Sequence, residues 1–171
     1  MSTASDDSTK QWWPADFRLI YRVNFGSELS LELEIQNDGT AHLHFEEALN
    51  AYHRVGDVRR ARLHGLDMVQ YVDKTDGYRK KLQQGEVVVT RETDRVYLNT
   101  PNALALLDPA SRRRVCLVKE NSLTTVVWNP VANKAKSMSD LGYHEWTQFL
   151  CIETSNVAAN AVILLPKSST A

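Results

Sequence analysis

Apolar and polar residues alternate along two neighbouring stretches near the start of the chain. Every second residue from Phe17 to Phe25 is apolar, and the residues between them are polar except at Ile20. The same alternation returns from Leu29 to Ile35, after a short turn that contains a glycine and a serine. A period of two residues is typical of a strand with one buried face. The pattern therefore predicts an antiparallel β-hairpin.

Short strand-like segments and turns continue through the rest of the sequence. Residues 132–146 are the best candidate for a helix or an irregular segment. The further predicted strands cover residues 42–45, 59–64, 86–90, 96–99, 103–108, 115–120, 124–129, 149–153 and 161–165. Many short strands at regular spacing indicate an all-β protein built as an antiparallel β-sandwich.

The length of 171 residues suits one domain. We expect a disordered polar tail at residues 1–11, a β-sandwich domain at residues 12–166 and a short tail at residues 167–171. The basic and acidic residues number 20 and 21, so the net charge of −1 argues against a nucleic-acid partner. No apolar run is long enough to cross a membrane. The first residues lack the basic start and apolar core of a signal peptide, so we expect a cytoplasmic protein.

The two cysteines, Cys116 and Cys151, are too few for a disulfide scaffold and fit thiols in a reducing compartment. The glycine-rich motifs that bind nucleotide phosphates are absent. His42 and His44 share one face of a predicted strand, but no third metal ligand is placed beside them, so we interpret the pair as part of an exposed polar face and expect no metal site. Three basic runs, at residues 59–62, 79–81 and 112–114, fit either phosphate binding or solvated turns.

Two carboxylates are candidates for chemistry. Glu153 ends an apolar run that begins at Phe149, so it is expected at the end of a buried strand. Burial raises the pKa of a carboxyl group toward that of a useful general base, although a structural hydrogen-bond acceptor would fit the same position. Asp94 stands at the entrance to a strand, where it could equally pair with Arg95 or cap a turn.

Six segments, in order and at fitting intervals, resemble the glucose-6-phosphate 1-epimerases of the aldose 1-epimerase, or galactose mutarotase-like, superfamily. They are ALNAYHRVGDV (48–58), YVDKTDG (71–77), ETDRVYLNT (92–100), TVVWNP (125–130), MSDLG (138–142) and LCIET (150–154). The resemblance implies a large antiparallel β-sandwich, of which this chain matches about the second half. It also implies an isomerase that interconverts the α and β anomers of hexose 6-phosphates by acid–base ring opening, without a metal or a cofactor.

By this resemblance, Glu153 matches the general base and Asp94 matches a carboxylate that binds substrate hydroxyls. The family's histidine acid falls at Asn50, and an amide cannot deliver a proton at neutral pH. His53 is three residues further along, which on a strand is the opposite face. The arginines that bind the phosphate in the family belong to the half that this chain does not match.

Three hypotheses follow from the resemblance and its departures. The first is a mutarotase-like isomerase that takes a hexose 6-phosphate or a related sugar. The second is a catalytically impaired homologue that binds a sugar or sugar phosphate. The third is a fragment that needs a complementing chain or a homodimer to complete the sandwich, because a partial sandwich leaves strand edges and an apolar face uncovered.

Overall fold

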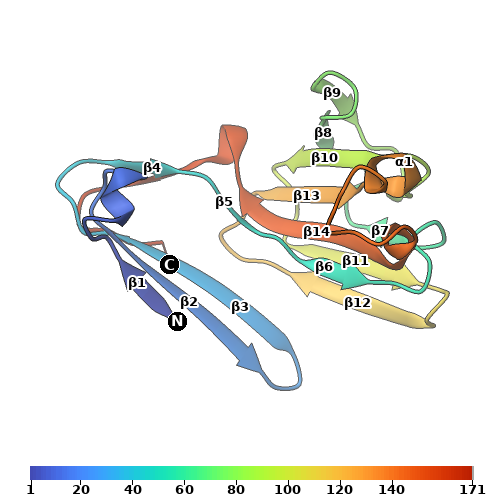
Figure 1. The fold of residues 1–171 in the computed structure, drawn as a ribbon, viewed down its shortest axis with the longest axis horizontal. Coiled ribbons are helices and arrows are strands. Elements are labelled where there is room, and N and C mark those ends of the chain that lie inside the picture. The colour runs from blue at the N-terminus through green and yellow to red at the C-terminus, as the bar shows by residue number, and fades with distance from the viewer. Residues whose placement is uncertain (171) are drawn as a thin grey trace. The chain divides into compact units, whose positions relative to one another are not determined.

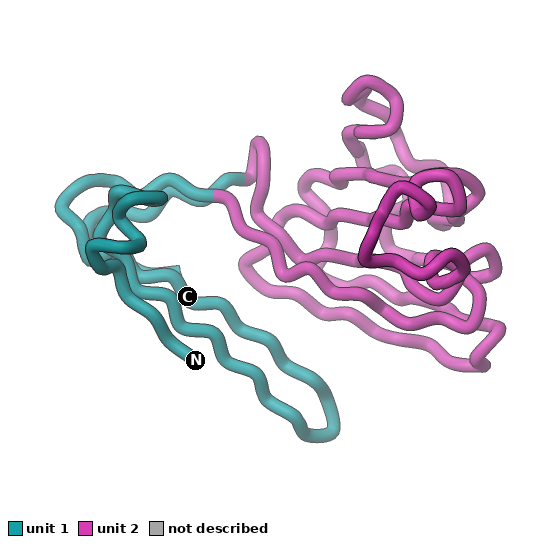
Figure 2. The backbone as a smooth tube through the Cα atoms, in the orientation of Figure 1, with its two compact units in different colours: residues 1–45, 161–171 teal, residues 46–160 magenta. Residues whose placement is uncertain are grey.

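The computed structural model describes residues 1–170, and strands make up most of its regular structure (Figure 1). All strand pairings between described residues are antiparallel, which confirms the predicted fold class. The chain divides into two compact units instead of the single domain expected over residues 12–166. Unit 1 contains residues 1–45 and the segment from residue 161 onward, and unit 2 contains residues 46–160 (Figure 2). The physical reason is that each unit has its own hydrophobic cluster.

Unit 1 consists of a three-stranded sheet and a two-stranded ribbon. The predicted hairpin is confirmed as β2 (Phe17–Phe25) and β3 (Leu29–Asn37). The other elements of this unit are β1 (Ser2–Ala4), which pairs with β2, the 3₁₀ turn η1 (Thr9–Gln11), and β4 (Leu43–Phe45) with its partner β15 (Val162–Leu164).

Both ends of the described chain are tied to this hairpin, which corrects the expected tails. At the N-terminal end, β1 pairs with β2, and the Ser5 backbone N–H donates to the Phe17 carbonyl at 2.8 Å. At the other end, the Thr170 N–H donates to the Ile35 carbonyl at 2.9 Å. Backbone hydrogen bonds of this kind do not require apolar side chains. Hydrophobic patterning therefore gave no sign of either pairing.

The apolar face of the hairpin is buried at one end and open at the other. Its buried end contributes Phe17 and Ile35 to the cluster of unit 1. At its open end, Phe25 and Leu29 stand opposite each other and are 84% and 60% exposed. The two-residue alternation thus continues well beyond the part of the hairpin that is covered.

Unit 2 is a sandwich of a large and a small sheet. The large sheet has the order β5-β14-β13-β10-β8-β9, and β6 also pairs with β14. Its strands are β5 (Glu47–Leu49), β6 (Tyr52–Arg54), β8 (Gln70–Asp73), β9 (Arg79–Leu82), β10 (Thr93–Leu98), β13 (Thr124–Asn129) and β14 (Phe149–Asn156). The small sheet has the order β12-β11-β7, with β7 (Arg62–His64), β11 (Ala103–Asp108) and β12 (Arg113–Val118).

One face of each sheet supplies the core of unit 2. The large sheet contributes Tyr97, Val127 and Leu150, and the small sheet contributes Leu63 and Leu106. Each of these side chains is at most 2% exposed. Because side chains alternate along a strand, the neighbours of the core residues on β10, β13 and β14 occupy the opposite face of the large sheet.

Several predicted elements differ from the structure. Four short strands, β5, β6, β8 and β9, were not predicted, and residues 86–90 form only an isolated bridge between Val87 and Leu63. The segment expected as a helix or an irregular stretch, residues 132–146, is mostly irregular and overlaps only the short helix α1 (Val131–Ala135) and the start of η2 (Glu145–Gln148). One further 3₁₀ turn is η3 (Ala158–Asn160). No helix among residues 1–170 has both the length and the apolar character needed to cross a bilayer.

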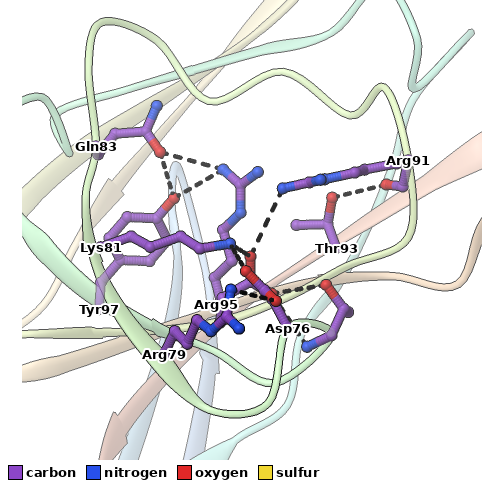
Figure 3. Close-up of polar contacts among 10 residues, drawn as sticks. Asp76, Arg79, Lys81, Gln83, Arg91, Thr93, Arg95 and Tyr97 are labelled. Atoms are coloured by element: carbon purple, nitrogen blue, oxygen red, sulfur yellow. Dashed lines mark hydrogen bonds and ion pairs between the residues drawn. The ribbon is translucent and has the colours of Figure 1, made fainter.

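A polar network supports the β8–β9 end of the large sheet. Asp73, at the end of β8, is buried and lies 2.7 Å from the ammonium group of Lys81. Nearby, the Tyr97 hydroxyl donates to the Gln83 side-chain oxygen at 2.7 Å, and Arg95 donates to the same oxygen at 3.1 Å (Figure 3). These contacts connect β8, β9, β10 and the loop after β9 through charge and hydrogen bonding rather than through apolar packing.

Candidate active site

Glu153 lies on β14, on the face of the large sheet away from the core of unit 2. Its neighbours Ile152 and Leu150 belong to that core, so Glu153 and Cys151 take the other face. On the adjacent strand β13, Val126 stands directly opposite Glu153. The Glu153 residue is half-buried.

The backbone register places Asn50 across from Glu153. Leu49 pairs with Thr154, and Tyr52 pairs with Cys151, so the two residues between Leu49 and Tyr52 face the two between Cys151 and Thr154. Between these pairs, the Ile152 N–H donates to the Ala51 carbonyl at 3.2 Å. The exposed residue Asn50 therefore stands directly opposite Glu153 in the register between residues 49–54 and β14.

Asp94 reaches the same face from β10. It stands opposite Trp128 on β13, and Trp128 in turn stands opposite Cys151 on β14. Asp94 therefore lies two strands across from Glu153 and one same-face position away along the strand direction. Its carboxylate lies 3.6 Å from the ammonium group of Lys74, and its backbone carbonyl accepts the Lys74 N–H at 2.9 Å. The alternative pairing with Arg95 is not formed.

The surroundings make Glu153 more basic than an ordinary glutamate. Burial raises the pKa of its carboxyl group, and the negative charge of Asp94 raises it further, while the positive charge of Lys74 opposes both. A raised pKa makes the carboxylate a better proton acceptor. The three groups thus form one electrostatic cluster on the open face of the sheet.

Aromatic rings lie beside this cluster. The ring centroids of Tyr52 and Phe149 are 5.1 Å apart, and those of Trp128 and Phe149 are 5.8 Å apart. Between them, Cys151 is fully buried, and burial together with the charge of Glu153 raises the pKa of its thiol to about 12. The thiol is therefore protonated at neutral pH and is a poor nucleophile. Of these rings, Tyr52 is exposed, whereas Phe149 is buried.

His53 does not join these groups. It pairs with the core residue Leu150, as expected for the opposite face of the strand. Burial lowers the pKa of its imidazole, although a hydrogen bond to the Ile152 backbone partly offsets this. Its Nε2 atom is buried and has no hydrogen-bond partner among residues 1–170.

Two hollows lie beside Arg54 rather than at Glu153, and Tyr52 and Phe149 line the first of them. The first has a volume of about 310 Å³ and the second about 340 Å³. Arg54 and Gln148 border both of them. Glu153, Asn50 and Asp94 line neither of these two hollows.

Sequence reasoning selected Glu153, Asp94 and Asn50, and the register brings all three to one face. It missed Lys74, which the structure places next to Asp94. The available signal was the motif YVDKTDG, which was quoted for the resemblance but was given no role. It also missed the aromatic group around Tyr52, because a short strand such as β6 has no readable alternation.

Comparison with solved structures defines the class of fold. A crystal structure of a "putative mutarotase" from Salmonella typhimurium matches with a TM-score of 0.86 and 27% identity, over 98% of this chain and 55% of that chain. A galactose mutarotase-like protein from Lactobacillus casei matches with a TM-score of 0.75 at 11% identity, over 99% of this chain and 65% of that one. The fold is therefore that of the galactose mutarotase-like proteins.

Sequence comparison identifies the family. The family model described as Aldose 1-epimerase matches residues 1–171. A "Putative glucose-6-phosphate 1-epimerase" from Cenchrus ciliaris is 34% identical over 150 residues, which cover 85% of this chain and 46% of that relative. A protein of the same name from Salmonella typhimurium is 33% identical, over 88% of this chain and 50% of its own length. The chain belongs to the aldose 1-epimerase family, and it spans about half the length of the curated relatives it matches.

Proposed function

We propose that the protein interconverts the α and β anomers of hexose 6-phosphates. Glu153 accepts the proton of the anomeric hydroxyl, the bond between C1 and the ring oxygen breaks, and the ring oxygen takes up a proton. Rotation about the C1–C2 bond and reclosure of the ring give the other anomer. One observation carries this proposal: a half-buried glutamate with a raised pKa shares a sheet face with Asp94 and Asn50.

Asp94 has two roles in this proposal. Its carboxylate accepts hydrogen bonds from sugar hydroxyls, and Lys74 holds it at the sheet face. Its charge also contributes to the raised pKa of Glu153. The binding group therefore also tunes the base.

Asn50 limits the rate that this site can reach. Its amide can donate a hydrogen bond to the ring oxygen but cannot donate a proton, so the proton must come from water. A missing general acid typically costs about 10²–10⁴ in rate. We therefore propose a slow epimerase rather than a fully equipped one.

The relatives from Cenchrus ciliaris and Salmonella typhimurium are both named as glucose-6-phosphate 1-epimerases, and this supports the choice of a hexose 6-phosphate as the substrate. The proposed place of action is the cytoplasm, where sugar phosphates are formed. The free thiols of Cys116 and Cys151 support a reducing compartment of this kind.

The test is NMR exchange spectroscopy between the anomers of glucose 6-phosphate. The wild-type chain should accelerate exchange above the buffer rate, and Glu153→Gln should return it to that rate. Glu120→Gln is the matched control, because Glu120 is exposed and lies outside the site. Exchange at the buffer rate with the wild-type chain, or unchanged acceleration in Glu153→Gln, would refute the proposal for this chain.

The loss of the acid at Asn50 also supports a second candidate function, a sugar-phosphate-binding homologue with impaired catalysis that could require a complementing chain or a second copy. Its signature would be saturable binding of glucose 6-phosphate without exchange. Light scattering would then show whether the chain is a monomer or is assembled with another copy.

A further inference from the structure

Arg54 lies on the same face of the large sheet as Glu153. It ends β6 and pairs with Phe149, which is four residues from Glu153 along β14. Four residues of a strand span about 13 Å. In a hexose 6-phosphate the phosphate is attached at C6, well away from the anomeric carbon. A phosphate group bound near Arg54 is therefore on the correct face and at a suitable separation from the base.

The guanidinium group of Arg54 is exposed and has no hydrogen-bond or ion-pair partner among residues 1–170. It borders the hollow of about 340 Å³, which we call the Arg54–Arg113 hollow and whose lining residues are Arg54, Val55, Gly56, Ser111, Arg113 and Gln148. It also borders the first hollow together with Glu145, whose carboxylate accepts the Gly142 N–H at 2.8 Å. Arg54 is thus a cation available for a ligand.

The wall opposite Arg54 is held in place by Asp108. This buried carboxylate accepts the Gly56 N–H at 3.1 Å and the Ser111 N–H at 3.2 Å, and it lies 3.3 Å from the Arg113 side chain. A Cβ atom at Gly56 would lie 2.7 Å from the Ser111 hydroxyl oxygen, so only glycine permits this close approach. Arg113 therefore lines the hollow while it is ion-paired with the same carboxylate that binds Gly56 and Ser111.

The charge balance of the hollow favours an anion. Two arginines line it, and no carboxylate of residues 1–170 does. The charge of Arg113 is compensated by its ion pair with the buried Asp108, so the unpaired Arg54 supplies the net positive charge. Arginine binds phosphate oxygens in a bidentate manner, and such charge-assisted hydrogen bonds are about twice as strong as neutral ones. The Ser111 residue adds a hydroxyl group to the same lining.

We infer that the Arg54–Arg113 hollow binds the phosphate group of a sugar phosphate. The link to anomer exchange rests on the proposed function, whereas phosphate binding in the hollow does not depend on it. The family arginines expected on the phosphate belong to the half of the domain that this chain does not match. The two arginines named here are a separate pair, supplied by β6 and β12.

The test is isothermal titration of the full chain with glucose 6-phosphate, inorganic phosphate and glucose. Arg54→Gln should weaken binding of both phosphate compounds about tenfold and leave the affinity for glucose unchanged. Arg60→Gln is the matched control, since Arg60 is exposed, has the same charge and lies outside the hollow. Arg113→Lys keeps the charge beside Asp108 and should still weaken phosphate binding, because lysine lacks the bidentate geometry.

The inference is overturned if the wild-type chain binds neither phosphate compound. It is also overturned if Arg54→Gln binds them as the wild type does, or if Arg60→Gln weakens them equally, since the effect would then be one of diffuse charge. Phosphate binding that depends on Arg54 but occurs without anomer exchange supports the hollow and refutes the proposed function. If anomer exchange depends on Glu153 but its KM is unchanged in Arg54→Gln, the proposed function is supported and phosphate binding in the hollow is refuted.

Discussion

At the residue scale, the chemistry depends on the rung of the ladder that Asn50 and Glu153 share. A base on one side of a hemiacetal is useful only if a proton can be delivered to the ring oxygen at nearly the same time. In the proposed function, Asn50 stands opposite Glu153 at the position that the resemblance assigns to the proton donor, but its amide can only donate a hydrogen bond. In the proposed function, the lack of a proton donor is therefore a property of this one side chain.

Asn50→His should restore a proton donor beside the ring oxygen. We expect the rate of glucose 6-phosphate anomer exchange, measured by NMR, to increase about 10²-fold or more. Asn24→His serves as the control, because Asn24 is an exposed residue on the β2–β3 hairpin. A rate in Asn50→His no higher than in this control would show that position 50 does not face the substrate.

In the proposed function, the pKa of Glu153 determines how the rate of anomer exchange falls at low pH. Only the ionised carboxylate accepts a proton, so activity should fall as the pH drops through a pKa that burial and Asp94 raise above 4.5. Asp94→Asn removes one of these causes, and the pKa of Glu153 should move down. The measurement is an NMR titration of ¹³C-labelled glutamate carboxyl groups, which does not require turnover. An upward movement in Asp94→Asn would contradict the electrostatic cluster described here.

At the element scale, prediction succeeded where one face of a strand is apolar over several residues. The β2–β3 hairpin was readable because its alternation is long, and β13 and β14 because they form continuous apolar runs. The strands β8 and β9 were missed, since QYVD and RKKL contain too few apolar residues to show a period. Residues 86–90 show the opposite error, because Val87 is buried against the core without joining a full strand.

The site could be predicted only in part, for a related reason. Glu153 was visible because a carboxylate at the end of an apolar run stands out. Asn50 was visible only through the resemblance, because nothing in its local sequence marks an asparagine between two short strands. Lys74 is positioned by the turn after β8 and by the pairing of β8 with β10. Neither feature can be predicted from the local sequence.

The stability of the β8–β9 end of the large sheet should depend on the buried carboxylate of Asp73. Asp73 accepts the Thr75 N–H at 3.0 Å and is paired with Lys81. Burial alone would raise the pKa of its carboxyl group, but the hydrogen bonds from Lys81 and Thr75 outweigh burial and lower it. Asp73→Asn should therefore reduce the free energy of unfolding in urea by about 1–3 kcal/mol at neutral pH.

The contribution of Asp73 to the free energy of unfolding should disappear as the pH is lowered. A lowered carboxyl pKa contributes stability at neutral pH that is lost as the pH falls through the folded-state value. The difference between Asp73→Asn and the wild type should then shrink in acid. Asp140→Asn, at an exposed position, should match the wild type throughout. An equal loss in both variants would argue against the network at β8 and β9.

At the scale of the whole molecule, the chain matches the family in fold while spanning about half the length of its curated relatives. Each unit has its own core, and the sheet face that carries Glu153, Asp94 and Asn50 belongs to unit 2. The open end of the β2–β3 hairpin, by contrast, exposes Phe25 and Leu29. Glu153, Asp94 and Asn50 thus all belong to unit 2, and the exposed apolar end of the hairpin belongs to unit 1.

The ladder between residues 49–54 and β14 has one further consequence. Side chains on a strand alternate between two faces, so a slip of one residue would turn Asn50 and Arg54 toward the core and bring His53 out. No intermediate alignment exists in which Asn50 only partly shares the face of Glu153. Damage to this pairing should therefore divide a population into competent and incompetent molecules rather than weaken every molecule a little.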